Sequence, residues 1–83
     1  MLFGLNLKLN GVIFTLMKAI DIGKTVSKRR NDLSIDQRDL SAIAGVAVHT
    51  LSNIEAGKGN PTVETLDRIL DALGLELHIK VKA

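Results

Sequence analysis

Basic side chains crowd one stretch of the chain, and the chemistry they could perform is the binding of a polyanion. Between residues 18 and 30 five positive charges stand against one negative charge, so the local charge is five minus one, or +4, in a chain whose net charge is only +2. The residues are Lys18, Lys24, Lys28, Arg29 and Arg30 against Asp21. Such a cluster can attract a phosphate-rich partner. A solvated helix face explains it equally simply and is the default interpretation for a basic run taken alone.

Catalytic and metal-binding chemistry find few candidates. Four serines, Ser27, Ser34, Ser41 and Ser52, have no histidine and carboxylate at a recognisable spacing, and the chain has no glycine-rich phosphate loop. With no cysteine and only His49 and His78, it has too few ligands for a structural zinc site. We therefore expect a protein that is not an enzyme and that binds no metal and no cofactor.

The composition fits one small domain. The chain has 83 residues, one proline and 46% hydrophobic residues, which is enough for one compact core and too little for two. Because cysteine is absent, a disulfide scaffold is excluded and a cytoplasmic location is expected. No apolar run reaches the roughly 18 residues that a membrane-spanning helix needs. A signal peptide is not expected, since the basic region and the cleavage site are missing.

The first sixteen residues have two interpretations. In "LNLKLNGVIFTLM" apolar residues alternate around Asn10-Gly11, a dipeptide typical of tight hairpin turns, so strands are expected near residues 5–9 and 12–16. Alternatively, Met17 is the true start of the protein and residues 1–16 are not made. The residues themselves leave both interpretations open.

The pattern that follows predicts a bundle of four to five short helices. A first amphipathic helix is expected near residues 19–32. The apolar residues expected on its inner side are Ile22, Val26 and Leu33. The last helix, in "VETLDRILDALG", is predicted because apolar residues recur at intervals of three and four between a Thr62 cap and a Gly74 stop.

Two shorter helices are predicted between these. In "IDQRDLSAIAG" Asp36 can cap the second helix and Gly45 can end it in a left-handed conformation, and the third helix follows in "AVHTLSNIEAG" and stops at Gly57. The residues expected inside are Leu40, Ile43, Ala44, Val46, Leu51 and Ile54. Two short capped helices joined by so tight a connection have the spacing of a helix-turn-helix.

The segment "GLELHIKVK" alternates apolar and charged residues, which predicts a half-buried β-strand. Its apolar residues are Leu75, Leu77, Ile79 and Val81. Nothing between residues 18 and 73 has the pattern of a strand that could pair with it. The partner is either the same strand of a second copy, in an isologous two-fold sheet, or the hairpin expected in residues 1–16, within one chain or in a larger dimeric sheet.

The string "IGKTVSKRR", followed by "IDQRDLSAIAGVAVHTLSNIEAGKGNPTVETLDRILDALG", resembles the Xre family of phage-repressor-like helix-turn-helix proteins. Its most specific parts are Gln37 at the head of the second helix, "IAGV" at the turn, "TLSNIEAGKGNP" and "TVETLDRILDALGL". The resemblance implies a mainly α, lambda-repressor-like fold. The segment "LELHIKVK" is similar to the C-terminal strand of HipB-type antitoxins, which pairs with its two-fold mate, and we therefore favour the two-fold sheet.

The resemblance also implies that the third helix lies in the major groove of double-stranded DNA while the second crosses the backbone. The positions that match base-reading residues are Val48, His49, Ser52 and Asn53. The positions that match phosphate contacts are Gln37, Thr50, Lys58 and Asn60. An internal ion pair between Arg30 and Glu55 is implied as well. A structural role is an equal alternative for His49. Ala47 departs from the family, where many relatives have a Ser or Thr cap, and so does Val48, where many have Arg or Gln.

The function implied is that of a repressor that binds an inverted-repeat operator as a homodimer. The C-terminal strand favours the antitoxin of a toxin–antitoxin operon that controls its own promoter, with a HipA-like serine/threonine kinase as partner. The alternatives are a free-standing phage-type regulator without a toxin and a protein-interaction module that does not bind DNA. The expected parts are an extension (1–16), a DNA-binding domain (17–74) and a dimerisation strand (75–83).

Overall fold

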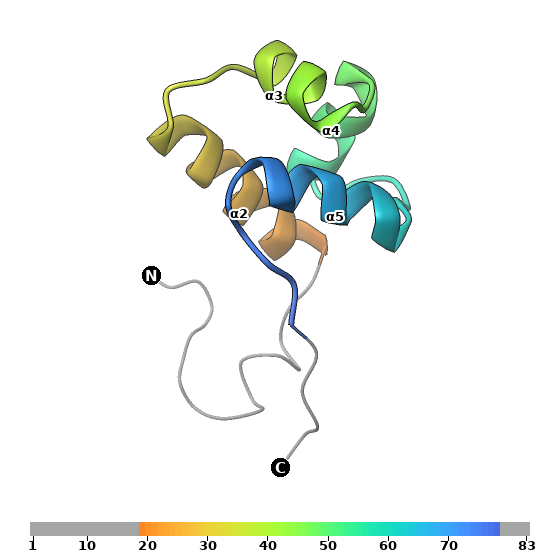
Figure 1. Ribbon diagram of the computed structural model, residues 1–83. Helices are drawn as coiled ribbons and strands as arrows, with labels where there is room; N and C mark the ends of the chain where they lie inside the picture. Colours follow the sequence, from red (N-terminus) through yellow and green to blue (C-terminus); the bar gives the residue numbers. More distant parts are fainter. Residues whose placement is uncertain (1–18, 79–83) are drawn as a thin grey trace.

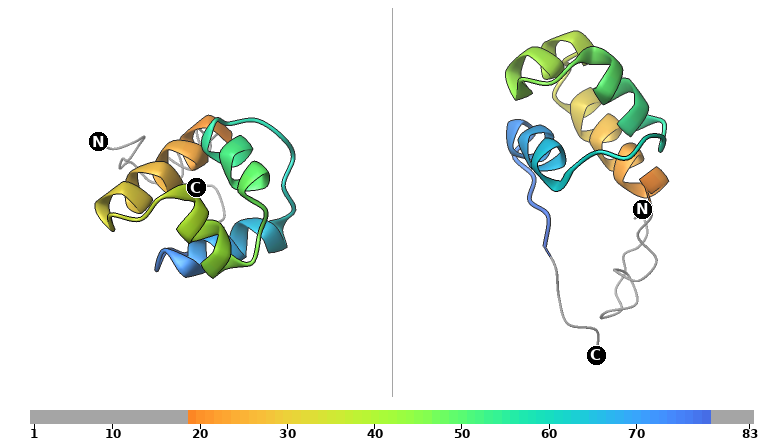
Figure 2. Two further views of the ribbon diagram at one scale, coloured as in Figure 1. Left: turned by 90° about the horizontal axis from the view of Figure 1, so that it is seen from above. Right: turned by 90° about the vertical axis from the view of Figure 1, so that its right-hand side faces the viewer.

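The computed structural model describes residues 19–78, which contain four helices (Figure 1). These are α2 (Ala19–Asp32), α3 (Gln37–Ala44), α4 (Val48–Glu55) and α5 (Val63–Ala72). Helix α4 packs against α2 and α3, and α3 also packs against α5. Figure 2 shows α3 and α4 at one end of the bundle, while the segment after α5 leaves at the opposite end. The expected mainly helical fold is confirmed over these residues.

Local hydrogen bonds fix the start of α3 and of α5. The Asp36 carboxylate accepts a hydrogen bond of 2.7 Å from the backbone N–H of Asp39, and the Asp39 carboxylate accepts one of 3.4 Å from the backbone N–H of Asp36. Thr62 caps α5 in the same way, because its hydroxyl oxygen accepts from the N–H of Thr65 at 3.0 Å. These side chains satisfy N–H groups that have no partner inside the helix. Both predicted caps are confirmed.

The helix ends are also set by local geometry. Gly45 ends α3 with φ +72°, and Gly57 follows α4 with φ +75°. After α4 the N–H of Gly57 donates to the carbonyl of Ile54 at 3.0 Å, and the N–H of Lys58 donates to that of Asn53 at 2.8 Å. This is the pair of hydrogen bonds of a Schellman motif. The predicted stop is confirmed, and the loop carrying Lys58 is held against the end of α4.

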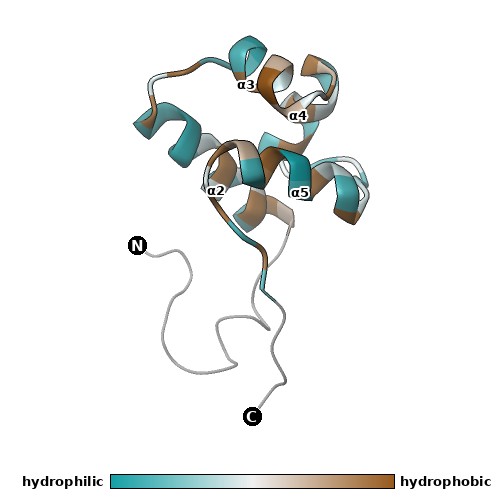
Figure 3. Ribbon diagram, in the orientation of Figure 1, coloured by the Kyte–Doolittle hydropathy of each residue, from teal (hydrophilic) through white to brown (hydrophobic). Residues whose placement is uncertain are grey.

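The core is formed by eight apolar residues, of which seven lie in the four helices and one, Leu73, ends α5. They are Val26, Leu40, Ala44, Leu51, Ile54, Ile69, Leu70 and Leu73. Figure 3 shows that apolar and polar stretches alternate along the helices. Two predictions of burial are wrong. Ile43 is 64% exposed because α3 buries the stripe of Leu40, Ser41 and Ala44 instead, and Leu33 is 42% exposed because α2 has already ended.

Helix α2 crosses the end of α4 at Gly23. This glycine is buried, and a Cβ atom placed on it would lie 2.8 Å from the carbonyl oxygen of Glu55 and closer still to that of Ile54. Both obstacles are backbone atoms, so they cannot turn away as a flexible side chain could. The close packing of the two helices therefore depends on the missing side chain.

The predicted C-terminal strand is not found over residues 75–78, and no strand occurs anywhere in the part of the chain that the structure describes. A strand requires backbone hydrogen bonds to a neighbouring strand, and no described segment of the same chain supplies one. Leu75 packs against the core, whereas Leu77 is 45% exposed. Ile79, Val81 and the expected hairpin of residues 1–16 lie outside the described residues. None of the four helices has the length and apolar character of a membrane span.

Candidate nucleic-acid interface

The four residues expected to read bases lie on one side of α4. Val48 is 45% exposed, His49 and Ser52 are exposed, and Asn53 is half-buried. The opposite side of the helix is fully engaged in the core, since Leu51 is 0% and Ile54 is 4% exposed. The spacing of the four residues keeps them in one stripe of a helix. We refer to Val48, His49, Ser52 and Asn53 as the outer face of α4.

Two side chains of this outer face contact each other. The Nδ2 atom of Asn53 lies 3.3 Å from Nε2 of His49, which precedes it by one helical turn. Sequence reasoning assigned both residues to base reading, with a structural role as an equal alternative for His49, and missed the contact. The four-residue spacing was the available signal, because side chains at i and i+4 are neighbours on a helix.

Residues expected to contact phosphates line an open hollow beside the C-terminal half of α4. Thr50, Lys58 and Asn60 surround it together with Asn53, and Ile54, Gly59 and Pro61 complete its walls. Within residues 19–78 the ammonium group of Lys58 forms no ion pair. The structure thus brings three of the four predicted phosphate residues together, next to one predicted base reader. The fourth, Gln37, lies elsewhere.

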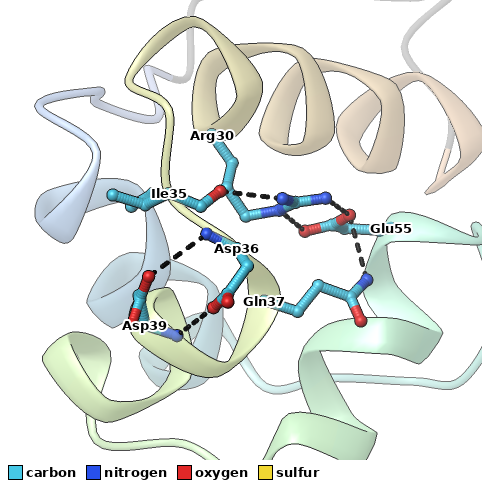
Figure 4. A network of polar contacts seen from close by, with 6 residues as sticks. All are labelled: Arg30, Ile35, Asp36, Gln37, Asp39 and Glu55. Carbon is cyan, nitrogen blue, oxygen red and sulfur yellow. Dashed lines mark hydrogen bonds and ion pairs between the residues drawn. The ribbon is translucent and has the colours of Figure 1, made fainter.

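Gln37 belongs to a polar network around Glu55 (Figure 4). The Glu55 carboxylate accepts hydrogen bonds from Arg30 Nε at 2.8 Å and Arg30 Nη2 at 2.9 Å. Its Oε1 atom also accepts from Gln37 Nε2 at 3.1 Å. Arg30 uses its remaining nitrogen, Nη1, to donate to the carbonyl of Ile35 at 2.9 Å. The ion pair implied by the resemblance is therefore present. The network around it includes Gln37, which sequence reasoning had assigned to a phosphate contact.

The electrostatics of this network favour its charged form. Burial by itself raises the pKa of Glu55. The hydrogen bonds donated by Arg30 and Gln37, together with the positive charge of Arg30, lower it by more, so the pKa lies below its usual value. The hydrogen bond to Glu55 raises the pKa of Arg30. The side chains of Arg30 and Glu55 are only 12% and 7% exposed. One carboxylate thus joins α2, the start of α3 and the end of α4.

The two arginines of the basic run in α2 bind partners inside the molecule. Arg29 Nε donates to the carbonyl of Leu73 at 2.9 Å and so binds the C-terminal end of α5, where unpaired carbonyls favour a cation. Arg30 binds Glu55, and Lys28 forms an exposed ion pair of 3.0 Å with Asp32. Neither a polyanion site nor a fully solvated face describes the two arginines. Their partners lie far away in the sequence, so no local signal could have revealed them.

The start of α4 lacks a side-chain cap. Ala47 occupies the cap position with φ −71° and ψ 146°, and no side chain accepts a hydrogen bond there. Its extended backbone is the conformation that capping residues adopt. The first turn of α4 therefore has the geometry for a cap without the oxygen atom that would complete it.

Comparison with known proteins bears on this arrangement of helices. The chain matches a family described as helix-turn-helix over residues 26–79, a range that includes α3, the turn and α4. It is 32% identical over 60 residues to an uncharacterized HTH-type transcriptional regulator of Sinorhizobium fredii, covering 72% of this chain and 77% of that protein. It is 38% identical over 56 residues to another of Haemophilus influenzae, covering 68% of this chain and 57% of that relative. The match thus spans little more than half of the second protein.

Proposed function

The chain belongs to the helix-turn-helix family, and from this we propose that it is a sequence-specific DNA-binding repressor of transcription. In this proposal α4 lies in the major groove and α3 crosses the DNA backbone. The observation that carries the proposal is the outer face of α4, where three of the four residues are exposed and Asn53 is half-buried, while the opposite side of the helix is packed in the core. A groove about 12 Å wide admits one helix presented in this way.

Base recognition would come from the outer face of α4. Asn53 carries both a donor and an acceptor and can pair with N7 and N6 of adenine, a contact worth about 1 to 3 kcal/mol of discrimination. Val48 offers an apolar surface, 45% exposed, for the methyl group of thymine. The hydroxyl of Ser52 can donate or accept, so it tolerates several bases.

Phosphate contacts would come from the hollow beside α4. Lys58 contributes the positive charge, and Thr50 and Asn60 contribute polar groups around the same opening. Such contacts position a protein on the duplex without reading its sequence. Gln37 can take part only with the amide proton that it does not donate to Glu55. The ion pair between Arg30 and Glu55 would act indirectly, by holding α4 at a fixed angle to α2.

A dimer that reads an inverted repeat is part of the proposal. Leu77 is 45% exposed between the polar residues Glu76 and His78, which suits a segment that pairs with a second chain. The pairing of residues 75–82 with their two-fold mates would satisfy backbone groups that a lone strand leaves open. Two copies of α4 would then face half-sites about one helical turn apart, or a multiple of it.

The biological setting that we propose is a toxin–antitoxin operon, with this chain as the antitoxin and a HipA-like serine/threonine kinase as the toxin. The likeness of "LELHIKVK" to the strand of HipB-type antitoxins supports this choice. A free-standing regulator without a toxin would have the same DNA-binding surface. A protein-interaction module is favoured by one observation, the apolar pair Ala47 and Val48 at the exposed start of α4.

The experiment that tests DNA binding is selection from randomised duplexes, followed by titration of the selected sequence and of an unrelated duplex at one salt concentration. The wild-type chain should enrich an inverted repeat. Asn53→Ala should weaken binding to the selected duplex by about tenfold, the loss of one bidentate base contact, and should leave binding to the unrelated duplex nearly unchanged.

Glu64→Gln is a matched control, because Glu64 lies in α5 in an exposed ion pair with Arg68. This variant should bind both duplexes as the wild type does. Equal losses on both duplexes for Asn53→Ala would contradict a base-reading role. Failure of the wild-type chain to enrich any sequence would favour the protein-interaction module. Light scattering of the full chain at micromolar concentration tests the dimer, and a monomer would contradict it.

A further inference from the structure

The contact between His49 and Asn53 defines which atoms are donors and acceptors. The two atoms that meet, 3.3 Å apart, are the amide nitrogen Nδ2 of Asn53 and the imidazole nitrogen Nε2 of His49. An amide nitrogen can only donate a hydrogen bond. A hydrogen bond between these two atoms requires Nε2 to accept, which is the tautomer that carries the ring proton on Nδ1. After this contact Asn53 still offers one N–H donor and the acceptor Oδ1.

We propose that His49 is a positioning residue that holds the Asn53 carboxamide in one orientation for base reading. The inference rests on the proposed function and adds to it the rule by which α4 reads a base. With Nδ2 bound to His49, the nitrogen of the amide is held on the side of the preceding turn and Oδ1 lies on the other side, while the second N–H stays available to a base. The order of donor and acceptor along the helix is thereby fixed.

A fixed order matters because the terminal torsion of asparagine has a broad, roughly two-fold preference. A free amide can turn over and exchange its oxygen and nitrogen. Adenine presents an acceptor, N7, beside a donor, N6–H, whereas guanine presents two acceptors. An amide held in one orientation therefore selects adenine on one strand of the duplex. An amide that turns over accepts an A·T pair in either direction.

Among the described residues, His49 is the group that can fix the orientation of the Asn53 amide. On its other side Asn53 adjoins the loop after α4, where a Cβ atom placed on Gly59 would lie 3.7 Å from Cβ of Asn53. Asn53 also lines the hollow beside α4, but within the described residues its side chain has no hydrogen bond other than that to His49. The loop limits the space of the side chain, and His49 sets its orientation.

The test compares two substitutions at the same exposed position. His49→Ala removes the acceptor. His49→Gln keeps one, because a glutamine side chain can reach the same neighbour and its Oε1 can accept from Asn53 Nδ2. Both variants and the wild type are taken through selection from randomised duplexes. The selected duplex is then titrated, together with a version in which the A·T pair read by Asn53 is reversed.

The wild type should prefer the selected orientation by about tenfold, as expected for one good bidentate contact. His49→Ala should bind both orientations alike, and His49→Gln should restore the preference. All three should bind an unrelated duplex equally. In the free protein, ¹⁵N spectra should show an imidazole protonated at Nδ1, and the Asn53 side-chain NH₂ signals should shift in His49→Ala and return toward the wild type in His49→Gln.

Three results would overturn the inference. If His49→Ala keeps the wild-type preference, His49 does not position Asn53. If His49→Gln fails to restore it, the imidazole itself reads a base. If the free protein shows an imidazole protonated at Nε2, the contact has the wrong polarity. A wild-type chain that selects no sequence would instead contradict the proposed function, and the inference would fall with it.

Discussion

Glu55 in α4 accepts two hydrogen bonds, of 2.8 and 2.9 Å, from Arg30 in α2, although 25 residues separate them in the sequence. Gln37 adds a third hydrogen bond from the first residue of α3. A single carboxylate therefore links α4 to two other helices and adds to the packing of Leu51 and Ile54 in the core. For the function proposed above such a constraint is useful, because small rotations of α4 would displace the side chains proposed to read bases.

Glu55→Gln should destabilise the protein by about 3 kcal/mol, because it leaves the guanidinium of Arg30 buried without a counter-charge. Urea unfolding at neutral pH measures this loss. Glu64→Gln provides the comparison, since it breaks an ion pair whose side chains are 54% and 76% exposed, and little stability should be lost. Equal losses in the two variants would show that burial of the Arg30–Glu55 pair contributes nothing.

Stability should fall in acid through the same carboxylate. Because the pKa of Glu55 is lower in the folded protein than its ordinary value of 4.5, the unfolded chain binds the proton more tightly. The stabilisation is thus fully present above about pH 4.5 and is lost as the pH falls through the folded-state pKa. Urea midpoints measured from pH 7 to pH 3 should decline less steeply in Glu55→Gln than in the wild type. Parallel curves would contradict this assignment.

Gly23→Ala should destabilise the protein by at least about 2 kcal/mol, because the added methyl group meets backbone carbonyls of α4 and must push the helices apart. Gly45→Ala is the matched control. Its φ of +72° carries a strain of about 1 kcal/mol, but an added Cβ would have no atom within 4 Å. In thermal unfolding the midpoint temperature of Gly23→Ala should therefore be lower than that of Gly45→Ala. The reverse order would mean that α2 can move away from α4 at little cost.

The local parts of this fold could be predicted from the sequence. Asp36 and Gly45 act on neighbours within four residues, and their chemistry is the same in any helix. The burial of Ile43 was mispredicted because three- and four-residue spacing admits two adjacent stripes on so short a helix. The stripe that faces inward is decided by the other helices, which the local pattern does not contain.

The sequence supplied candidate positions for the site but not their arrangement. The structure places Thr50, Lys58 and Asn60, which the resemblance matched to phosphate contacts, around one hollow. The hydrogen bond of Arg29 to the carbonyl of Leu73 spans 44 residues, so only the folded chain reveals it. The contact of Gln37 with Glu55 is non-local in the same sense. Residue type alone could not distinguish an amide that faces DNA from one that faces a buried carboxylate.

Ala47→Ser should stabilise the protein by about 1 kcal/mol, because it supplies the missing acceptor at the start of α4 without changing the extended backbone at that position. Thermal unfolding measures the gain. Ala47→Val adds a similar or larger volume at this exposed position but no acceptor, so it should not stabilise. A gain in both variants would point to packing rather than capping.

Lys58→Ala should weaken binding to every DNA duplex and reduce the slope of log K against log salt by about one unit, because one phosphate contact is lost. The reason lies in the placement of Lys58, which the Schellman motif fixes at the edge of the hollow beside α4 and which forms no ion pair within the described residues. Lys28→Ala removes an equal charge from α2, where Lys28 is bound to Asp32. It should leave the slope nearly unchanged, although the net charge of both variants is the same. Binding titrations at four or more salt concentrations separate the two explanations. If both variants flatten the slope equally, the attraction depends on total charge, and the hollow is not a phosphate site.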